Sequence, residues 1–272
     1  MPPFDLLVPR TETEAVALAG GTDLLLDLDE RRVAPRRVVS LRRLPWRRHD
    51  FEGGGLRIGG TEPLAVLEAD PRLGQGFPAL AQAIAAVGSP ALREQATVGG
   101  NLGRAAPASD LLPVLLAMDA EVETVSRSGS RRLSVDSFLR ASRATELGRG
   151  ELVRSVHLPE ARPSSAYLWQ RVRPANDISQ IGVAVGFSPQ EGGWRASLGG
   201  VPPRAVLARE VAGLLRGARP VDRDIAAASD RLADHPALVS DRRATEEHRR
   251  RLAAILLARA VRSAVDEPGP GS

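Results

Sequence analysis

The sequence of 272 residues contains no cysteine. Thiolates are the usual ligands of iron–sulfur clusters and of many structural zinc sites, and a disulfide needs two of them. The chain therefore cannot hold a cysteine-ligated cluster, a cysteine zinc site or a disulfide. Any iron–sulfur carrier that works with it has to belong to another polypeptide.

Lysine is also absent, so all 37 basic residues are arginine. This absence excludes Schiff-base catalysis and the lysine-dependent phosphate loop of nucleoside triphosphatases. A codon bias toward GC-rich triplets explains the replacement of lysine by arginine more simply than a functional demand for guanidinium groups.

Aromatic residues make up only 3% of the chain, which leaves few side chains on which bases could stack. The pI of 10.8 reflects the high pKa of arginine, because the formal net charge is only +4. The arginines are moreover scattered along the chain rather than confined to one stripe. Nucleic acid is therefore not expected as a partner.

No apolar stretch approaches the roughly 20 residues that cross a bilayer. The first five residues also lack the basic start and apolar segment of a secretory signal. These absences predict a cytoplasmic protein without a membrane span. The four histidines do not occur in metal-ligand spacing, so no metal site is expected either.

Two glycine pairs carry the strongest positive signal in the sequence. The first lies in Ala19-Gly20-Gly21-Thr22-Asp23-Leu24 and the second in Ala96-Thr97-Val98-Gly99-Gly100-Asn101. Paired glycines let the backbone approach an anion and turn successive N–H groups toward it. Neither pair has the spacing of the common dinucleotide or P-loop fingerprints. Each pair alone is more simply explained as a tight turn, whereas together they predict a diphosphate held from both sides.

The stretch 96–122, with the second glycine pair and a downstream Ser-Asp, closely resembles the FAD-binding medium subunit of molybdenum hydroxylases. That family includes carbon monoxide dehydrogenases and the FAD domain of xanthine dehydrogenases. The first glycine pair is similar to the family's other flavin loop. Weaker similarities follow in the family's order at 133–159, 176–185, 197–205 and 241–260, so that the resemblance covers almost the whole chain.

The resemblance implies an α+β fold, namely the PCMH-type FAD-binding fold of two α/β subdomains followed by a C-terminal domain of antiparallel strands and helices. The expected FAD-binding subdomains are 1–50 and 51–160, and the expected C-terminal flavoprotein domain is 161–272. The stretch 162–165 is the most credible boundary.

Hydrophobic periodicity and turn residues predict the individual elements. Strands are expected at 15–18, 37–41, 56–58, 120–126, 132–135, 151–158, 178–187 and 194–198, the third of them exposed. Helices are expected at 23–30, 65–69, 77–87, 111–118, 205–217, 220–236 and 244–265, with Pro90 closing the helix before it.

FAD is the cofactor that the resemblance implies, and its diphosphate is expected at the two glycine loops. Backbone N–H groups and the Thr22 hydroxyl would hold it from one side. Gly99 and Gly100 would hold it from the other, with Thr97 and Asn101 donating through their side chains.

Asp110 corresponds to an aspartate that hydrogen-bonds the cofactor in the family, and its carboxylate can accept from ribityl or ribose hydroxyls. Its alternative role, shared with Ser109, is to cap the helix that follows. No catalytic side chain and no metal ligand is expected. The expected cofactor-binding residues are Ala19, Gly20, Gly21, Thr22, Asp23, Leu24, Thr97, Gly99, Gly100, Asn101, Ser109, Asp110 and Val153.

The activity implied by the resemblance is electron transfer. FAD would take electrons from a [2Fe-2S] small subunit and pass them to an external acceptor, while substrate is oxidised on a large molybdopterin subunit.

The chain departs from the family pattern at three places. The stretch 9–19 is short, Glu94 stands where the family has asparagine, and the family's flavin-facing lysine near Trp169 is absent. Arg171 or Arg173 could supply positive charge instead. A cofactor-free assembly subunit of the same complex therefore remains an alternative. A stand-alone flavin oxidase is the other, although no histidine or cysteine for covalent attachment lies near either loop.

Overall fold

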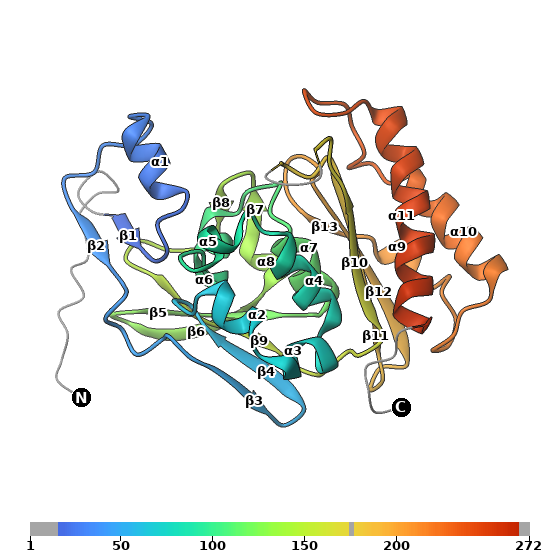
Figure 1. Cartoon of the computed structure of the whole chain (residues 1–272), viewed down its shortest axis with the longest axis horizontal. Coiled ribbons are helices and arrows are strands. Elements are labelled where there is room, and N and C mark those ends of the chain that lie inside the picture. The colour runs from blue at the N-terminus through green and yellow to red at the C-terminus, as the bar shows by residue number, and fades with distance from the viewer. Residues whose placement is uncertain (1–15, 174–176, 267–272) are drawn as a thin grey trace.

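The computed structural model describes residues 16–173 and 177–266. Residues 9–15 of the stretch 9–19, which is short relative to the family pattern, therefore lie outside the described residues. Figure 1 shows the elements in a row, from the small N-terminal unit of β1 (Val16–Leu18), α1 (Leu24–Asp29) and β2 (Val38–Ser40) to the C-terminal helices. Antiparallel sheets with helices on their faces dominate, which confirms the α+β fold class. No helix in the described ranges is long and apolar enough to cross a membrane.

The remaining elements follow in chain order. The strands are β3 (His49–Glu52), β4 (Gly55–Gly59), β5 (Glu121–Ser126), β6 (Gly129–Ser134), β7 (Leu139–Ala141), β8 (Ala144–Thr145), β9 (Leu152–Leu158), β10 (Ser165–Gln170), β11 (Ile181–Ser188), β12 (Gly193–Gly199) and β13 (Val206–Leu207). The helices are α2 (Leu64–Glu68), α3 (Pro71–Gly76), α4 (Pro78–Ala86), α5 (Pro90–Arg93), α6 (Val98–Arg104), α7 (Leu111–Ala117), α8 (Val135–Phe138), α9 (Arg209–Ala212), α10 (Asp222–Ala233) and α11 (Glu246–Asp266).

The middle of the molecule is a five-stranded sheet in the order β3-β4-β9-β5-β6, with every neighbouring pair antiparallel. Its inner face packs under helices through Leu56, Ile58 and Val156, which are 2% exposed or less. The expectation of an exposed strand at 56–58 is therefore wrong. The alternation is real, but the apolar side chains point into the core and Arg57 points away from it.

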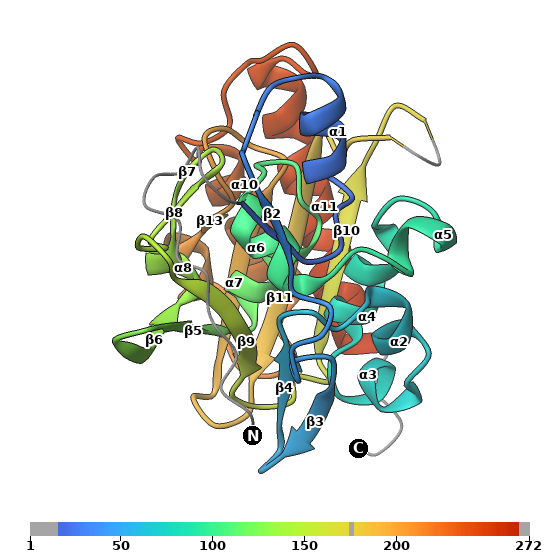
Figure 2. The ribbon, with the colours of Figure 1, turned by 90° about the vertical axis from the view of Figure 1, so that its left-hand side faces the viewer.

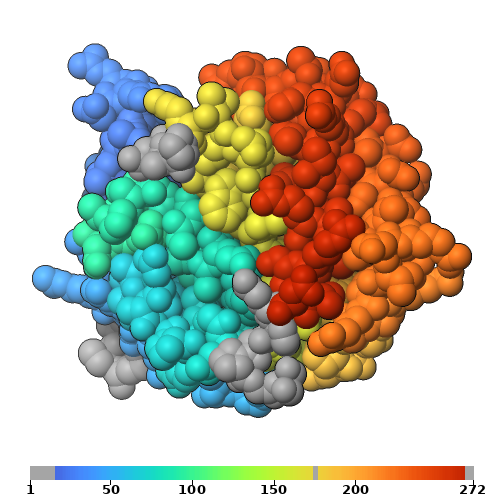
Figure 3. Space-filling view, turned by 45° about the vertical axis from the view of Figure 1, so that its right-hand side comes forward, coloured from blue at the N-terminus to red at the C-terminus, as the bar shows by residue number. Residues whose placement is uncertain are grey.

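The C-terminal part is built on a second antiparallel sheet in the order β10-β11-β12-β13. Helices α4 and α7 contact one face and α11 contacts the other, so the sheet separates two apolar cores. In the space-filling view α11 and α10 form the outer layer of this end (Figure 3). The first strand, β10, begins at Ser165, the last residue of the expected boundary at 162–165, and was not predicted from the sequence.

Two predicted helices are corrected by the structure. Pro90 does not close a helix: it occupies the first turn of α5, where its missing N–H costs nothing, and Ser89 caps that helix through Leu92 N. The stretch 205–217 contains the short strand β13 and the short helix α9 instead of one helix. Val206 pairs with Leu198 of β12, so sheet pairing has overridden the helical composition.

Candidate functional site

A cavity of about 320 Å³ lies between the N-terminal unit and the five-stranded sheet. It is walled by β1, the loop into α1, helix α6 and the start of β9. The expected residues that line it are Ala19, Gly20, Gly21, Thr22, Asp23, Leu24, Thr97, Gly99, Gly100, Asn101 and Val153. Ser109 and Asp110 are not among the lining residues.

The two glycine pairs lie against each other at this cavity. A Cβ atom built on Gly20 would lie 1.9 Å from the Gln95 carbonyl oxygen, and one on Gly100 would lie 4.0 Å from Ala19 Cβ. A Cβ on Gly99 would meet the Gly60 oxygen at 2.3 Å. The glycines thus allow three backbone segments to converge where side chains would hold them apart.

The loop from Gly20 to Leu24 presents backbone donors that the rest of the described chain does not use. Leu25 N donates to Gly21 O, but none of the five N–H groups before it has an acceptor among the described residues. The Thr22 hydroxyl likewise has no partner there. Gly20, Gly21, Thr22 and Leu24 are half-buried and Asp23 is exposed, so a ligand can reach this run of free donors. Successive free N–H groups of this kind are suited to a ligand rich in oxygen atoms.

The second glycine pair lies in the first turn of α6 and not in a loop, which corrects the expectation. Thr97 is the N-cap, and its hydroxyl oxygen accepts from Gly100 N at 2.9 Å. The Asn101 amide donates to Thr97 O and accepts from the Ser109 hydroxyl. Gly99 N has no backbone acceptor among the described residues, so it is the member of this pair that is free to bind a ligand.

Arg104, at the end of α6, is the only cation among the described residues that line the cavity. Its guanidinium group forms an ion pair with Asp27 of α1, with Nη2 3.1 Å from Oδ1, and its Nε lies 3.7 Å from Asp23. The Nε itself is buried and has no hydrogen-bond acceptor in the part of the chain that the structure describes. Arg104 and Arg32 together hold the pKa of Asp27 below its usual value. This ion pair ties the N-terminal unit across the cavity to α6.

Asp110 lies in a separate buried cluster at the junction with the C-terminal sheet. Its Oδ1 accepts from the Tyr167 and Ser179 hydroxyls, each at 2.7 Å, and its Oδ2 accepts from Arg171 Nη2 at 2.7 Å. The side chain makes no cap bond to α7, so the capping role expected for it is wrong. A carboxylate has about four acceptor positions, and these bonds leave one of them on Oδ2.

Burial dominates the electrostatics of this cluster. It raises the pKa of Asp110, with the charge of Arg171 acting in the opposite direction, and it raises the pKa of Tyr167 well above its ordinary value. Arg171 also lies over the Trp169 ring, 5.4 Å from its centroid. Asp110 pairs with Arg171 directly, so this carboxylate compensates the positive charge that Arg171 could supply in place of the family's lysine.

Several lining residues were missed by sequence reasoning. They are Val16, Ala17, Leu18, Leu41, Gly60, Gly103, Arg104, Leu147, Glu151 and Leu152. Gly60 carried a usable signal, because it belongs to a further glycine pair, Gly59-Gly60, just before the helix expected at 65–69. Glu151 lines the cavity, but its carboxylate is engaged by Arg131, Thr124 and Gly148 N, and Arg131 is the main reason that its pKa falls to about 2.

Two protein-family models match the chain. Residues 6–161 match the model described as FAD binding domain in molybdopterin dehydrogenase, and residues 166–264 match that of the CO dehydrogenase flavoprotein C-terminal domain. A xanthine dehydrogenase FAD-binding subunit from Escherichia coli O157:H7 is 28% identical over 94% of this chain and 90% of its own. The carbon monoxide dehydrogenase medium chain of Afipia carboxidovorans is 26% identical, with 96% of both chains covered.

Solved structures give the same result for the fold. A chain of quinoline 2-oxidoreductase from Pseudomonas putida 86 superposes with a TM-score of 0.85 at 26% identity, covering 94% of this chain and 90% of that one. A chain of the Cu,Mo-CO dehydrogenase reaches the same TM-score at 23% identity.

Proposed function

Because this chain belongs to the family of FAD-binding domains of molybdopterin dehydrogenases, we propose that it binds FAD in the cavity at the two glycine pairs and serves as an electron-transfer subunit. The observation that carries this proposal is the run of backbone N–H groups from Gly20 to Leu24, which belong to residues that line the cavity and have no acceptors among the described residues. A diphosphate supplies the oxygen acceptors that such a run requires.

The residues fit the cofactor in three ways. The Gly20–Leu24 amides, the Thr22 hydroxyl and Gly99 N would bind the diphosphate, while Val153 supplies an apolar wall. Glycine at positions 20 and 99 keeps the segments close enough to act together. A volume of about 320 Å³ is at the lower end of the range for small-molecule sites, so the cofactor would also extend beyond this cavity.

Asp110 would orient the flavin end of the cofactor. Tyr167, Ser179 and Arg171 fix the carboxylate, and the remaining acceptor position on Oδ2 would take a cofactor hydroxyl. Ser109 acts through Asn101, whose amide oxygen accepts from its hydroxyl. No acid, base or nucleophile is assigned to this chain, because bound FAD itself performs the two-electron chemistry.

We further propose the source and destination of the electrons. The chain has no cysteine, so the iron–sulfur clusters that feed it lie on a [2Fe-2S] small subunit, and a molybdopterin large subunit oxidises the substrate. The final acceptor is external to the complex. The cytoplasmic location expected from the sequence stays a prediction, which cell fractionation would check.

The experiment is to purify the full chain and record its visible spectrum, then denature it and count the FAD released per chain. We expect a flavin spectrum and one FAD per chain. We also expect weaker FAD binding in Thr22→Ala than in a Thr245→Ala control, because Thr245 lies just before α11 and its hydroxyl accepts from His248 N. A chain that takes up no FAD from a saturating solution would establish the assembly-subunit alternative. A chain that binds FAD but copurifies from its host without iron or molybdenum would favour the stand-alone oxidase.

A further inference from the structure

The arginines are not evenly scattered, contrary to the expectation from the sequence. Eight of the 37 lie between residues 31 and 48, in the adjacent pairs 31–32, 36–37, 42–43 and 47–48, and no acidic residue occurs among them. Since the whole chain carries +4 and this stretch +8, the other residues together carry −4. The basic character of the protein is therefore concentrated in one segment.

This segment runs over one side of the molecule. Figure 2 shows the chain from α1 through β2 to β3 along the face turned to the viewer, and all eight arginines are exposed. The guanidinium groups of Arg36, Arg37, Arg43 and Arg47 have no ion-pair or hydrogen-bond partner among residues 16–173 and 177–266. Such a concentration of uncompensated charge is unfavourable within the isolated chain.

Two more arginines extend the segment around a hollow on the outer side of the five-stranded sheet. The hollow has a volume of about 410 Å³ and is lined by Pro45, Trp46, Arg48, Arg57 and Arg154, together with Gly59 and Val125. Arg57 and Arg154 share one carboxylate, that of Glu123, at 3.7 and 3.2 Å, so the hollow keeps a positive excess. We call residues 31–48 with Arg57 and Arg154 the arginine face.

We propose that the arginine face docks an acidic surface of a neighbouring polypeptide in the complex, with a carboxylate side chain entering the hollow. This proposal rests on one part of the proposed function, namely that the chain is a subunit of a multi-subunit complex. Guanidinium groups bind carboxylates through two parallel N–H donors. The adjacent arginine pairs between residues 31 and 48 therefore present several such donor pairs along the arginine face. A nucleic acid is less well matched, because Trp46 is the only aromatic residue of this stretch and is 7% exposed, so it offers no surface for base stacking.

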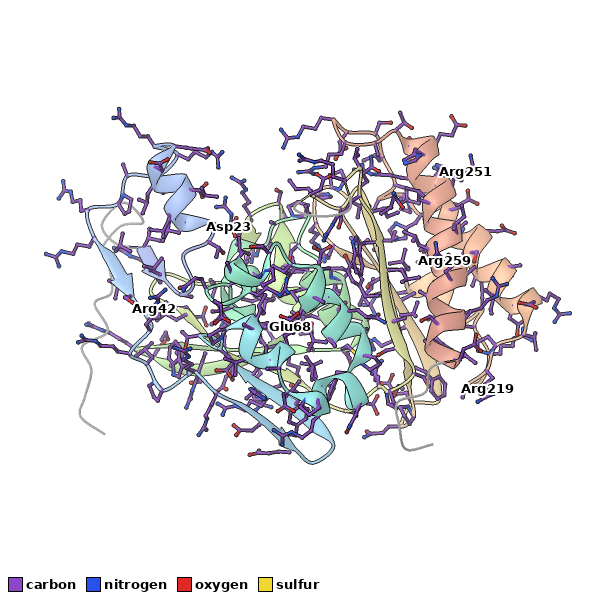
Figure 4. The ribbon with its side chains drawn as sticks, in the orientation of Figure 1. Asp23, Arg42, Glu68, Arg219, Arg251 and Arg259 are labelled. Atoms are coloured by element: carbon purple, nitrogen blue, oxygen red, sulfur yellow. The ribbon has the colours of Figure 1, made fainter. Side chains whose placement is uncertain are left out.

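The first test is arginine footprinting with phenylglyoxal, read by mass spectrometry, on the free chain and on the complex isolated from its host through a tag on this chain. We expect Arg36, Arg37, Arg43 and Arg47 to react in the free chain and to be protected in the complex. Arg219, Arg251 and Arg259, at the opposite end of the molecule in Figure 4, should react equally in both. Equal reactivity of the arginine face in both samples overturns the proposal.

The second test uses a variant in which Arg36, Arg37, Arg43 and Arg47 are all replaced by glutamine. Its control replaces four exposed arginines of the C-terminal part, Arg216, Arg219, Arg251 and Arg259, by glutamine, so that both variants lose the same charge. We expect the first variant to associate with the partner subunits roughly tenfold more slowly at low salt, and the difference to vanish at high salt. The control should associate as the unchanged chain does.

FAD content separates the possible failures. If both variants bind FAD and assemble at equal rates, the docking proposal is wrong and the proposed function stands. If the unchanged chain isolates without any partner polypeptide, both are wrong. Protection of the arginine face by added single-stranded DNA, but not by the partner subunits, would replace the acidic polypeptide by a nucleic acid.

Discussion

Replacing Gly20 by alanine should separate the two glycine pairs and weaken FAD binding. The added Cβ would lie 1.9 Å from the Gln95 carbonyl oxygen and 3.2 Å from Ala96 Cα, and these are backbone atoms that cannot rotate away. Carbon and oxygen atoms normally stay more than 3 Å apart, so the segments must move apart by about 1 Å or more.

The structure sets the size of this effect. Overpacking of this kind costs about 1–3 kcal/mol of folding free energy, and each kcal/mol lowers the melting temperature of a chain of this size by about 2–4 °C. Binding should suffer as well, because amides from both segments are to act on one diphosphate. We expect an FAD dissociation constant at least tenfold higher, which corresponds to about 1.4 kcal/mol.

The assay combines thermal unfolding of the apoprotein with titration of FAD, followed by flavin fluorescence. Gly74→Ala is the matched control, because a Cβ there meets no atom within 4 Å and the residue lies in helix α3, far from the cavity. The control should bind FAD normally and unfold no earlier than the unchanged protein. Normal melting and normal affinity in Gly20→Ala would show that the two segments are not in contact, and the reasoning about the site would fail with it.

Three further predictions follow from the polar contacts. Arg104→Gln should loosen the tie between α6 and α1, raising hydrogen exchange of the α1 amides while leaving those of α11 unchanged; unchanged exchange in α1 would refute the role given to the ion pair. Asp110→Asn should lower the free energy of unfolding in urea by about 3–5 kcal/mol, because it leaves Arg171 buried without a counter-charge. Tyr167→Phe removes one hydrogen bond to the same carboxylate and should lower it by only about 1 kcal/mol. Equal losses in the two variants would contradict this ranking. The Glu151 pKa of about 2 lies below its ordinary value of 4.5, so its ionised form adds stability above pH 4.5 that is lost as the pH falls toward 2. In Glu151→Gln the free energy of unfolding should therefore depend less on pH between 4.5 and 2. An identical pH profile in the variant and the unchanged protein would refute this.

The sequence was informative where the signal is local. Paired glycines with their polar neighbours located the cavity, because the backbone freedom they report is a property of the residues themselves. Strands such as β5 and β9 were found because their apolar alternation survives without knowledge of the partner strand. The sequence could not show that Pro90 begins a helix, because proline at a first helical turn and proline after a last turn look alike without the flanking hydrogen bonds.

The remaining errors have a common physical cause, namely contacts between distant residues. Val206 joins a strand because Leu198 is beside it, and nothing in 205–217 reports that neighbour. Asp110 has the sequence position of a helix cap, yet Tyr167, Arg171 and Ser179 take its carboxylate from more than 50 residues away. Arg104 was overlooked because its partner Asp27 is 77 residues distant.

Neighbouring residues on β9 and at the end of β4 border the cavity and the outer hollow. Val153 and Gly60 line the cavity, while Arg154 and Gly59, next to them, line the hollow. The paired strands β4 and β9 therefore form part of the wall of both the cavity and the hollow. If a ligand bound in the cavity or a partner bound at the hollow shifts these strands, the free energy of that shift contributes to both binding equilibria. Thermodynamic reciprocity then requires that a subunit that binds the flavin-loaded chain more tightly than the flavin-free chain raises the affinity of the chain for flavin by the same factor.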